Sequence, residues 1–329
     1  MRIDLSPEKL EAIVLDCLRE NYGLEASLCR LGGENLNFLV QTNSGERFVF
    51  KVVDDDMPPE VVAMEFRAIE HATSAGIQMD FPKIIESAYG KIETGITLHK
   101  NERYRARLLH FIEGKVFENC SDISINLLRN YGKALGGFDL AMHSFEDPAM
   151  YRTHRWDLTR AGRHRDKVNL IDDPEKHELL DWAFDTWEQG AQRCFPQLPK
   201  QFIHGDANRA NVLVEGDNVV GLVDFGDSCY NPTICELGVC LAYIMMDQED
   251  PIGAALTVAR GYHDERPLSA LEQSVLLPLV LGRLAVTISV AARRRTIDPD
   301  HPNWFDSEKQ AWKLLPLLRE LKPEAFYFL

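Results

Sequence analysis

The sequence lacks paired cysteines. Its seven cysteines are scattered along 329 residues, and none forms a Cys-x2-Cys pair. This odd set suggests neither a disulfide framework nor a zinc site, so we read the cysteines as reduced, mostly buried thiols. The chain also lacks a run of eighteen apolar residues, and its beginning, Met1-Arg2-Ile3-Asp4, has no signal-peptide core. We therefore expect a cytoplasmic protein without a membrane partner.

Positive charge is scarce. The 36 Lys and Arg residues stand against 51 Asp and Glu, which gives a formal net charge of −15. Such a balance argues against DNA, RNA or an anionic membrane as a partner, and it permits a cationic substrate without showing one. Apolar residues make up 45% of the chain and charged residues 26%, as is ordinary for a globular protein with a sizeable core. The length suggests two domains, or one domain with two lobes.

The chemistry of the chain is concentrated between residues 202 and 227. An apolar segment leads to Asp206, Asn211 follows five residues later, and a second apolar segment leads to Asp224. Phosphoryl transfer needs a carboxylate that orients the attacking hydroxyl and accepts its proton, and it needs Asn and Asp side chains that hold Mg²⁺. We assign Asp206 to the first role and Asn211 and Asp224 to the metal. Two short strands ending in turn-forming residues would explain each position alone, but they explain the set poorly.

These residues carry a resemblance. The string His-Gly-Asp-x4-Asn followed by Asp-Phe-Gly resembles the catalytic and metal loops of the aminoglycoside phosphotransferase and choline kinase superfamily. The sequence around both loops, together with Glu236-Leu237 and Pro302-Asn303-Trp304, is most similar to that of the hydroxylysine kinase branch. The resemblance covers nearly the whole chain. It implies an α+β, two-lobed, protein-kinase-like fold, in which residues 1–110 form a nucleotide-binding lobe with an antiparallel sheet and residues 111–329 form a mainly helical catalytic lobe.

A glycine loop lies between the first two expected strands. Gly32, Gly33 and Asn35 stand where backbone N–H groups could approach phosphate oxygens, although a plain tight turn is an equal alternative. Lys51, on the expected strand 47–53, favours the interpretation that this loop binds phosphate.

Four further residues complete the expected nucleotide site. In a kinase-like lobe, a strand lysine such as Lys51 binds the α and β phosphates and pairs with a glutamate on the next helix. The resemblance favours Glu65 as that glutamate. It also places the link between the lobes near residues 109–114, where backbone groups of His110 and Ile112 would hold the adenine.

Local patterns predict the secondary structure. We expect strands over 26–30, 36–41, 47–53, 83–87, 91–98 and 104–111, and helices over 7–21, 59–75, 123–144, 174–194, 249–263, 268–295 and 307–321. Ser6 and Ser307 are the expected N-caps of the first and last helix. The basic run Arg293-Arg294-Arg295 reads as a solvated helix end rather than a nucleic-acid patch.

The segment after Asp224 is short. It has no room for the activation loop and Ala-Pro-Glu motif of protein kinases, so we expect a small-molecule acceptor. Relatives implied by the resemblance phosphorylate hydroxylated amines. Asp227 and Glu236 could hold the ammonium of such a substrate, and an aromatic wall could come from Trp156, Tyr262 or Trp304, although each of these aromatics taken alone is better explained as core. Arg283 could pair with a substrate carboxylate or with Glu236.

The sequence thus predicts a phosphotransferase that moves the γ-phosphate of ATP or GTP, with Mg²⁺, to a hydroxyl of an amino alcohol or hydroxylated amino acid similar to hydroxylysine. Homoserine, choline, ethanolamine and aminoglycosides stay open as acceptors, as does a non-catalytic nucleotide-binding protein. A monomer and a homodimer are both compatible with the sequence.

Overall fold

The computed structural model describes residues 5–32, 36–53, 57–98, 102–301 and 304–327. The chain divides into two compact units. The first comprises Met1–Glu70 and Phe81–Glu113, and the second comprises His71–Asp80 and Gly114–Leu329. The boundary therefore lies near the expected position 110, but the end of one helix and the residues after it, 71–80, belong with the second unit.

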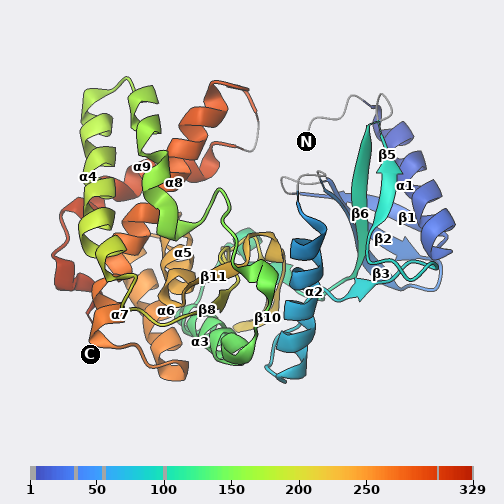
Figure 1. Ribbon diagram of the computed structural model, residues 1–329, viewed down its shortest axis with the longest axis horizontal. Coiled ribbons are helices and arrows are strands. Elements are labelled where there is room, and N and C mark those ends of the chain that lie inside the picture. Colours follow the sequence, from blue (N-terminus) through green and yellow to red (C-terminus); the bar gives the residue numbers. More distant parts are fainter. Residues whose placement is uncertain (1–4, 33–35, 54–56, 99–101, 302–303, 328–329) are drawn as a thin grey trace. The chain divides into compact units, whose positions relative to one another are not determined.

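The first unit is built on an antiparallel sheet (Figure 1). Its strands run in the order β1-β2-β3-β6-β4, and β5 also pairs with β6. Their bounds are β1 Ala26–Leu31, β2 Leu36–Thr42, β3 Arg47–Val53, β4 Ile84–Ile85, β5 Thr94–Thr97 and β6 Arg103–His110. The expected turn at 42–45 joins β2 and β3, with Gly45 at a positive φ of 90°.

Helix α1, Pro7–Tyr22, covers one face of this sheet. It begins as the sequence predicts, because the Ser6 side chain accepts a hydrogen bond from the Lys9 N–H and Pro7 occupies the first helical turn. Its apolar stripe packs against the alternate buried residues of β2, β3 and β6, including Phe38, Phe50 and Leu108. The other face of the sheet is consequently left for Lys51 and its neighbours, since side chains alternate along a strand.

The second unit is mainly helical. Its helices are the end of α2, Pro59–Ser74, then α3 Ile125–Ala141, α4 Pro174–Gly190, α5 Ile234–Ile244, α6 Pro251–Glu265, α7 Ala270–Ser274, α8 Leu276–Arg295 and α9 Asp306–Arg319. Short 3₁₀ segments lie at Phe117–Asn119, Met142–Ser144, Pro148–Met150, Leu158–Leu170, Gln192–Cys194, Phe225–Asp227 and Pro323–Phe326.

Two small sheets lie among these helices (Figure 1). One has the order β10-β9-β7, with β7 Lys115–Val116, β9 Val212–Glu215 and β10 Asn218–Leu222. The other pairs β8, Lys200–Ile203, with β11, Cys229–Pro232. The loops between β8 and β9 and between β10 and β11 carry the candidate catalytic residues.

Helix α8 is the central core helix of the second unit. It is long and apolar enough to cross a membrane by length and composition, but 94% of its most apolar window is buried inside the protein. It packs against α4, α5 and α9 and against the 3₁₀ segment Leu158–Leu170. Close packing also joins α3 to α6, where a Cβ at Gly132 would come within 1.9 Å of the Val258 carbonyl oxygen.

Two helix predictions were wrong. The helix expected over 268–295 is broken at Val275 into α7 and α8. The break has a physical cause, because Pro278 has no N–H to donate to the carbonyl of Ser274, four residues earlier. Ser307 is not an N-cap, since α9 begins one residue before it, and the acidic Asp306 and Glu308 occupy the first turn instead.

Candidate active site

Asp206 lies in the loop between β8 and β9, and Asn211 fixes it from within the same loop. The Asn211 side-chain Nδ2 donates to the Asp206 backbone oxygen and to the Asp206 Oδ2, both at 2.9 Å. Because the amide nitrogen is used in this way, the amide oxygen of Asn211 is the atom that can bind a metal. The five-residue spacing of Asp206 and Asn211 in the sequence therefore places the two side chains in direct contact.

Arg283 on α8 holds the other carboxylate oxygen of Asp206. Its Nη2 donates to Oδ1 of Asp206 at 2.8 Å and to the Tyr243 hydroxyl at 3.3 Å, while Nη1 donates to the backbone oxygen of Trp156 at 3.2 Å. The Arg283 side chain is only 2% exposed. Its hydrogen-bonded carboxylate is Asp206, so the pairing with Glu236 that the sequence left open is wrong, while contact with a substrate carboxylate stays a prediction.

The environment of Asp206 favours its protonated form more than water does. Burial, helped by the nearby carboxylates of Asp227 and Asp224, outweighs the lowering by Arg283 and raises the pKa of this carboxyl to about 7. A carboxylate whose pKa lies near 7 is well matched to accept a proton at neutral pH.

Glu236 lies beneath the catalytic loop. Its carboxylate is fully buried and accepts hydrogen bonds from the backbone N–H groups of His204, at 2.5 Å, and Gly205, at 3.1 Å. Burial raises its pKa to about 7 even though these backbone groups lower it. The prediction that Glu236 holds a substrate ammonium was wrong, since the residue shapes the loop from inside the core.

His204 also positions the loop. Its Nε2 donates to the Val223 carbonyl oxygen at 3.0 Å, and its Nδ1 accepts from the Asp206 N–H at 3.3 Å. A carbonyl oxygen only accepts, so these two contacts assign the neutral tautomer with the proton on Nε2. The imidazole thereby ties the segment before Asp224 to the loop that carries Asp206.

Gly205 is the glycine that this loop requires. Its φ is +77°, and a Cβ there would lie 2.8 Å from the backbone oxygen of Asp227. Only glycine meets both conditions without strain. Asp224 adopts the left-handed region as well, with a φ of 65° and a ψ of 73°. An Asp in this conformation is uncommon, and such positions are often functional.

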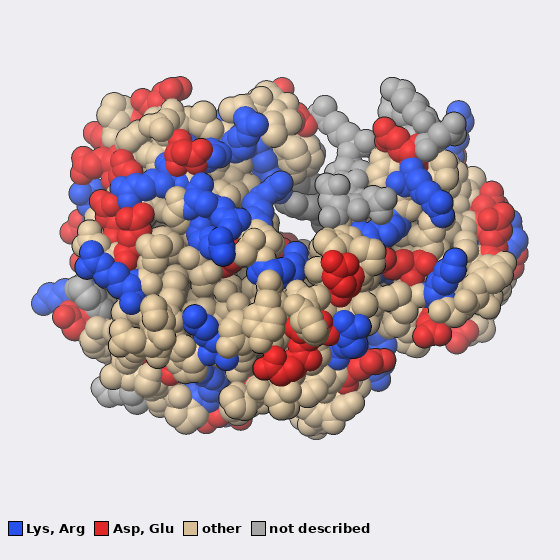
Figure 2. All heavy atoms as spheres, in the orientation of Figure 1, with Lys and Arg blue, Asp and Glu red and all other residues tan. Residues whose placement is uncertain are grey.

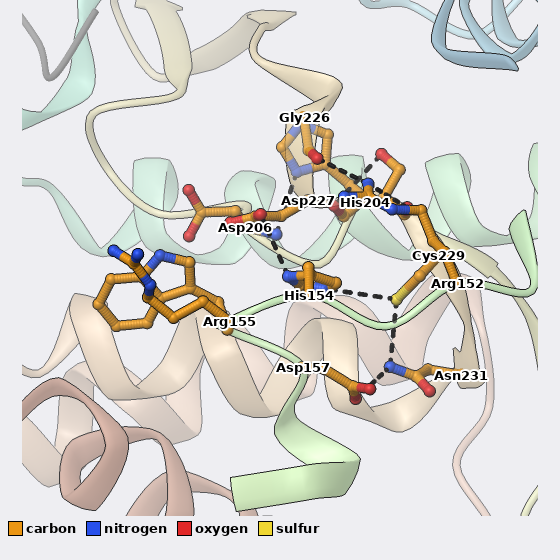
Figure 3. Close-up of polar contacts among 12 residues, drawn as sticks. Arg152, His154, Arg155, Asp157, His204, Asp206, Gly226, Asp227, Cys229 and Asn231 are labelled. Carbon is orange, nitrogen blue, oxygen red and sulfur yellow. Dashed lines mark hydrogen bonds and ion pairs between the residues drawn. The ribbon is translucent and has the colours of Figure 1, made fainter. Parts of the chain in front are cut away.

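Asp227 begins a buried polar network that Figure 3 displays. Its Oδ1 lies 3.1 Å from Nδ1 of His154, whose Nε2 lies 3.5 Å from Sγ of Cys229. Burial raises the pKa of Asp227, but the contact with His154 and the charge of Arg283 outweigh burial and lower it overall. Asp227 is therefore held as an anion close to Asp206.

The network continues away from the loop. Asn231 donates to Sγ of Cys229 at 3.2 Å and to Oδ1 of Asp157 at 3.0 Å (Figure 3). The Thr159 hydroxyl donates to the same Asp157 oxygen at 2.6 Å. Nearby, Arg152 donates to the backbone oxygens of Gly226 and Ser228 at 2.8 and 3.3 Å. The segment 152–159 thus supports the loop that bears Asp224 and Asp227, a role that we did not predict from the sequence.

The oxygen donors present suit a divalent metal. Asn211 and Asp224 offer an amide and a carboxylate oxygen, the ligands that Mg²⁺ prefers, and a nucleotide's phosphates usually supply the rest. Within the described ranges, no three His, Cys, Asp or Glu side chains gather closely enough to hold a metal by themselves. The residues therefore fit an ion that is shared with a phosphate better than a metal caged by protein.

The predicted aromatic wall is only partly present. Trp156 and Trp304 are half-buried, but arginines lie over their rings: Arg283 is 4.8 Å from the Trp156 centroid, and Arg294 is 5.0 Å from the Trp304 centroid. Tyr262 is fully buried and its hydroxyl donates to Asp139. The tyrosine therefore belongs to the core, which is the alternative that the sequence left open for it.

In the first unit, Lys51 and Glu65 have a neighbour that sequence reasoning missed. Arg107 on β6 lies directly opposite Lys51 on β3, so the two side chains share a face of the sheet. Arg107 donates to Glu65 on α2 at 2.7 Å and to Glu93 at 3.1 Å, and all three side chains are largely buried. In the sequence, an arginine at an alternate position of a strand looks the same whether its side chain binds buried carboxylates or is exposed to solvent.

Of the other residues predicted to contact the nucleotide, the structure describes Gly32, His110 and Ile112. Gly32 is exposed at the end of β1, whereas Gly33 and Asn35 lie outside the described residues. The N–H of His110 already donates to the Lys83 carbonyl at 2.8 Å, and Ile112 is buried. A base bound at His110 would therefore use its carbonyl.

A family model described as "Phosphotransferase enzyme family" matches residues 25–271. This match spans most of the chain. The chain belongs to the phosphotransferase enzyme family. It is thus a phosphotransferase with an alcohol group as acceptor, and a small-molecule kinase.

Individual relatives are similar over most of their length. Hydroxylysine kinase of Mus musculus is 22% identical over 320 residues, which cover 89% of this chain and 84% of the relative. Homoserine kinase of Brucella anthropi is 26% identical over 262 residues, which cover 76% and 73%. These identities leave the acceptor of this phosphotransferase open.

Solved structures are similar in fold. A microcompartment-associated aminopropanol kinase has a TM-score of 0.71 at 17% identity, and the match covers 94% of both chains. An amicoumacin kinase in complex with AMP-PNP, Ca²⁺ and Ami has a TM-score of 0.69 at 16% identity, and the match covers 97% of this chain and 96% of that chain. The α+β, kinase-like fold expected for this phosphotransferase is confirmed.

Proposed function

We propose that this phosphotransferase moves the γ-phosphoryl group of ATP or GTP to a hydroxyl of a hydroxylated amino acid or amino alcohol similar to hydroxylysine. The observation that carries the proposal is the state of Asp206. Its two carboxylate oxygens are fixed by Asn211 and Arg283, and its pKa lies near 7. A carboxylate oriented in this way can align a hydroxyl and take its proton.

Each site residue has its own proposed role in phosphoryl transfer. Asp206 orients the acceptor hydroxyl and accepts its proton as the new P–O bond forms. Mg²⁺, when bound through Asn211 and Asp224, would neutralise charge on the phosphates. Lys51, whose partner would be Glu65, would bind the phosphates from the first unit, and Gly32, Gly33, Asn35, His110 and Ile112 are proposed as further nucleotide contacts. Most of the rate enhancement then comes from positioning and charge stabilisation.

The acceptor class rests on two supports. Three of the four proteins named above are kinases of hydroxylysine, homoserine and aminopropanol, which all carry an amine and a hydroxyl. In this chain, Asp227 is an anion near Asp206 with about a quarter of its side chain exposed, so it can receive the ammonium of an acceptor. Trp156, Trp304 and Arg283 would line the same side of the acceptor.

The test is nucleotide turnover with Mg²⁺ across 5-hydroxylysine, homoserine, 3-aminopropan-1-ol, choline, ethanolamine and an aminoglycoside, with ATP and GTP in parallel. We expect turnover on a hydroxylated primary amine and formation of its phosphate ester, seen by ³¹P NMR. Turnover on choline alone, or on the aminoglycoside alone, would contradict the proposed acceptor class. Failure to bind either nucleotide would contradict the kinase assignment itself.

A cytoplasmic location and a monomeric or homodimeric state stay predictions. Sedimentation of the purified chain with and without nucleotide would distinguish the two states.

A further inference from the structure

The two carboxylate oxygens of Asp227 have different surroundings. Oδ1 lies 3.1 Å from Nδ1 of His154, whose side chain is only 6% exposed. Oδ2 has no hydrogen-bond or ion-pair partner among the residues that the structure describes, and about a quarter of the Asp227 side chain is exposed. One oxygen is therefore held from inside the protein, and the other can receive a ligand.

Behind the imidazole of His154, a thiol determines which ring nitrogen carries the proton. Nε2 of His154 lies 3.5 Å from Sγ of Cys229, and Nδ2 of Asn231 donates to the same sulfur at 3.2 Å. Burial raises the pKa of the Cys229 thiol, so the sulfur keeps its proton. Because the sulfur accepts from Asn231, its own S–H can donate to Nε2. His154 is then neutral, and its proton is on Nδ1, beside Asp227.

The amide of Asn231 is oriented in turn by Asp157. Nδ2 of Asn231 donates to Oδ1 of Asp157 at 3.0 Å, and a carboxylate can only accept. The nitrogen of the amide, rather than its oxygen, therefore faces the sulfur of Cys229. Asn231, Cys229 and His154 thus form a donor chain that ends at Asp227 (Figure 3).

Asp227 is also fixed to the loop that bears Asp206. A Cβ at Gly205, the residue before Asp206, would lie 2.8 Å from the backbone oxygen of Asp227. Beside it, Oγ of Ser228 donates to the backbone oxygen of His204 at 3.3 Å. The charge of Asp227 contributes to the raised pKa of Asp206, so the two carboxylates act on each other. A group bound at Asp227 is consequently close to the proposed base.

Little free space surrounds the imidazole. The cavity beside it has a volume of about 10 Å³, and its lining includes His154, Gly205, Cys229 and Cys235. This volume has room for about one water molecule. Close packing therefore restrains the ring in addition to its polar contacts.

The negative charge of Asp227 is left for a ligand. The terminal nitrogens of Arg283 are engaged by Asp206, Tyr243 and the Trp156 backbone, and a neutral imidazole supplies no full positive charge. On the visible face of the helical unit, Lys and Arg side chains lie among Asp and Glu (Figure 2). The surface as a whole does not select for a cation, so attraction for an ammonium must come from carboxylates within the site.

We propose that His154 is a positioning residue for the ammonium of the acceptor. It holds Oδ1 of Asp227, with the thiol of Cys229 behind it, so that Oδ2 faces the ammonium while the acceptor hydroxyl lies at Asp206. This inference rests on the proposed function and assigns its specificity for amines to the donor chain. His154 itself touches neither substrate, and it takes no part in proton or phosphoryl transfer.

The experiment compares acceptors that differ only in one amine. The pairs are homoserine with 4-hydroxybutanoate, 3-aminopropan-1-ol with propan-1-ol, and 5-hydroxylysine with 2-amino-5-hydroxyhexanoate, which lacks the amine beside the hydroxyl. The unchanged enzyme should prefer the amine of its productive pair by at least about tenfold in kcat/KM, as expected for a charge-assisted contact. His154→Leu should lower kcat/KM for that amine by about tenfold through KM, and it should leave kcat, nucleotide KM and the amine-free partner unchanged.

Two further comparisons separate positioning from packing. His154→Asn keeps an N–H close to the place of Nδ1 and should restore most of the affinity for the amine. Cys229→Ala removes the S–H behind the imidazole and should raise the amine KM by about 3- to 10-fold, the usual worth of one neutral hydrogen bond. Cys235→Ala is the matched control, since it removes a buried thiol from the same cavity without touching the donor chain, and its amine KM should stay normal. Unfolding midpoints measured beside the kinetics show that each variant is folded.

An equal loss on the amine and its amine-free partner in His154→Leu would overturn the positioning role and leave the proposed function standing. Equal effects of Cys229→Ala and Cys235→Ala on the amine KM would remove the thiol from the account in the same way. Turnover by the unchanged enzyme on none of the three amines would instead overturn the proposed function.

Discussion

Arg283 donates a hydrogen bond of 2.8 Å to Asp206, a residue 77 positions earlier in the chain. The contact joins the central core helix α8 to the loop that holds the proposed base. It therefore transmits the rigidity of the core to the one carboxylate whose position matters most for transfer.

Replacement of Arg283 should alter the pH dependence of turnover. The base must be deprotonated, so kcat/KM should fall as the pH falls through the pKa of Asp206, which is about 7. Arg283 lowers this pKa, and its loss in Arg283→Met should move the acidic limb upward by about 1–3 pH units. The pH profile of kcat/KM measures this. Arg283→Lys, which keeps a charge, should shift it less, and an unmoved limb in Arg283→Met would contradict the electrostatic role.

Glu236 should matter for stability and loop position rather than for acceptor affinity. Glu236→Ala leaves the buried N–H groups of His204 and Gly205 without their acceptor, which costs about 1–3 kcal/mol for each group in the free energy of unfolding. Urea denaturation and steady-state kinetics should show lower stability and lower kcat with little change in acceptor KM. Glu236→Gln keeps one acceptor oxygen and should be milder. A rise in acceptor KM alone, with stability intact, would restore the substrate role.

Two glycines with positive φ offer a matched comparison. Gly205 has a φ of +77° and lies against the Asp227 backbone, whereas Gly216 has a φ of +56° with nothing near its missing side chain. Gly216→Ala should cost about 1–2 kcal/mol of stability, the price of left-handed backbone, with normal kcat. Gly205→Ala should cost at least as much and also lower kcat, because the Asp206 loop must shift. Similar kcat values for the two variants, measured beside their unfolding curves, would show that this loop tolerates displacement.

Arg107 should stabilise the first unit strongly. Its loss in Arg107→Met removes the buried cation that binds both Glu65 and Glu93 and should cost about 3–5 kcal/mol in the free energy of unfolding. Arg47 forms the matched exposed pair with Glu113, and Arg47→Met should cost at most about 1 kcal/mol. Nucleotide KM should rise in Arg107→Met only, since Glu65 would lose its position. Equal unfolding midpoints for the two variants would contradict this ranking.

The contact between Asp206 and Asn211 follows from the sequence, whereas the side chains that support this loop do not. Asp206 and Asn211 are five residues apart, so local chain geometry alone brings them together, and the match to a known motif added the fold. Arg283, His154 and Arg107 gave no comparable signal, because their partners lie 77, 73 and 42 positions away and only the packed fold brings them close. The same limit explains Glu236: the sequence suggested a substrate ammonium or Arg283 as its partner, but the backbone N–H groups that it binds belong to another element.

The most direct test of the central claim is phosphoryl transfer by Asp206→Asn, an isosteric change that keeps the size of the side chain and removes its basicity. With saturating nucleotide, Mg²⁺ and the best acceptor, we predict that kcat falls by at least about 10²-fold while nucleotide affinity and the unfolding midpoint stay close to those of the unchanged enzyme. Near-normal kcat in this variant would contradict the assignment of Asp206 as the base on which the account depends.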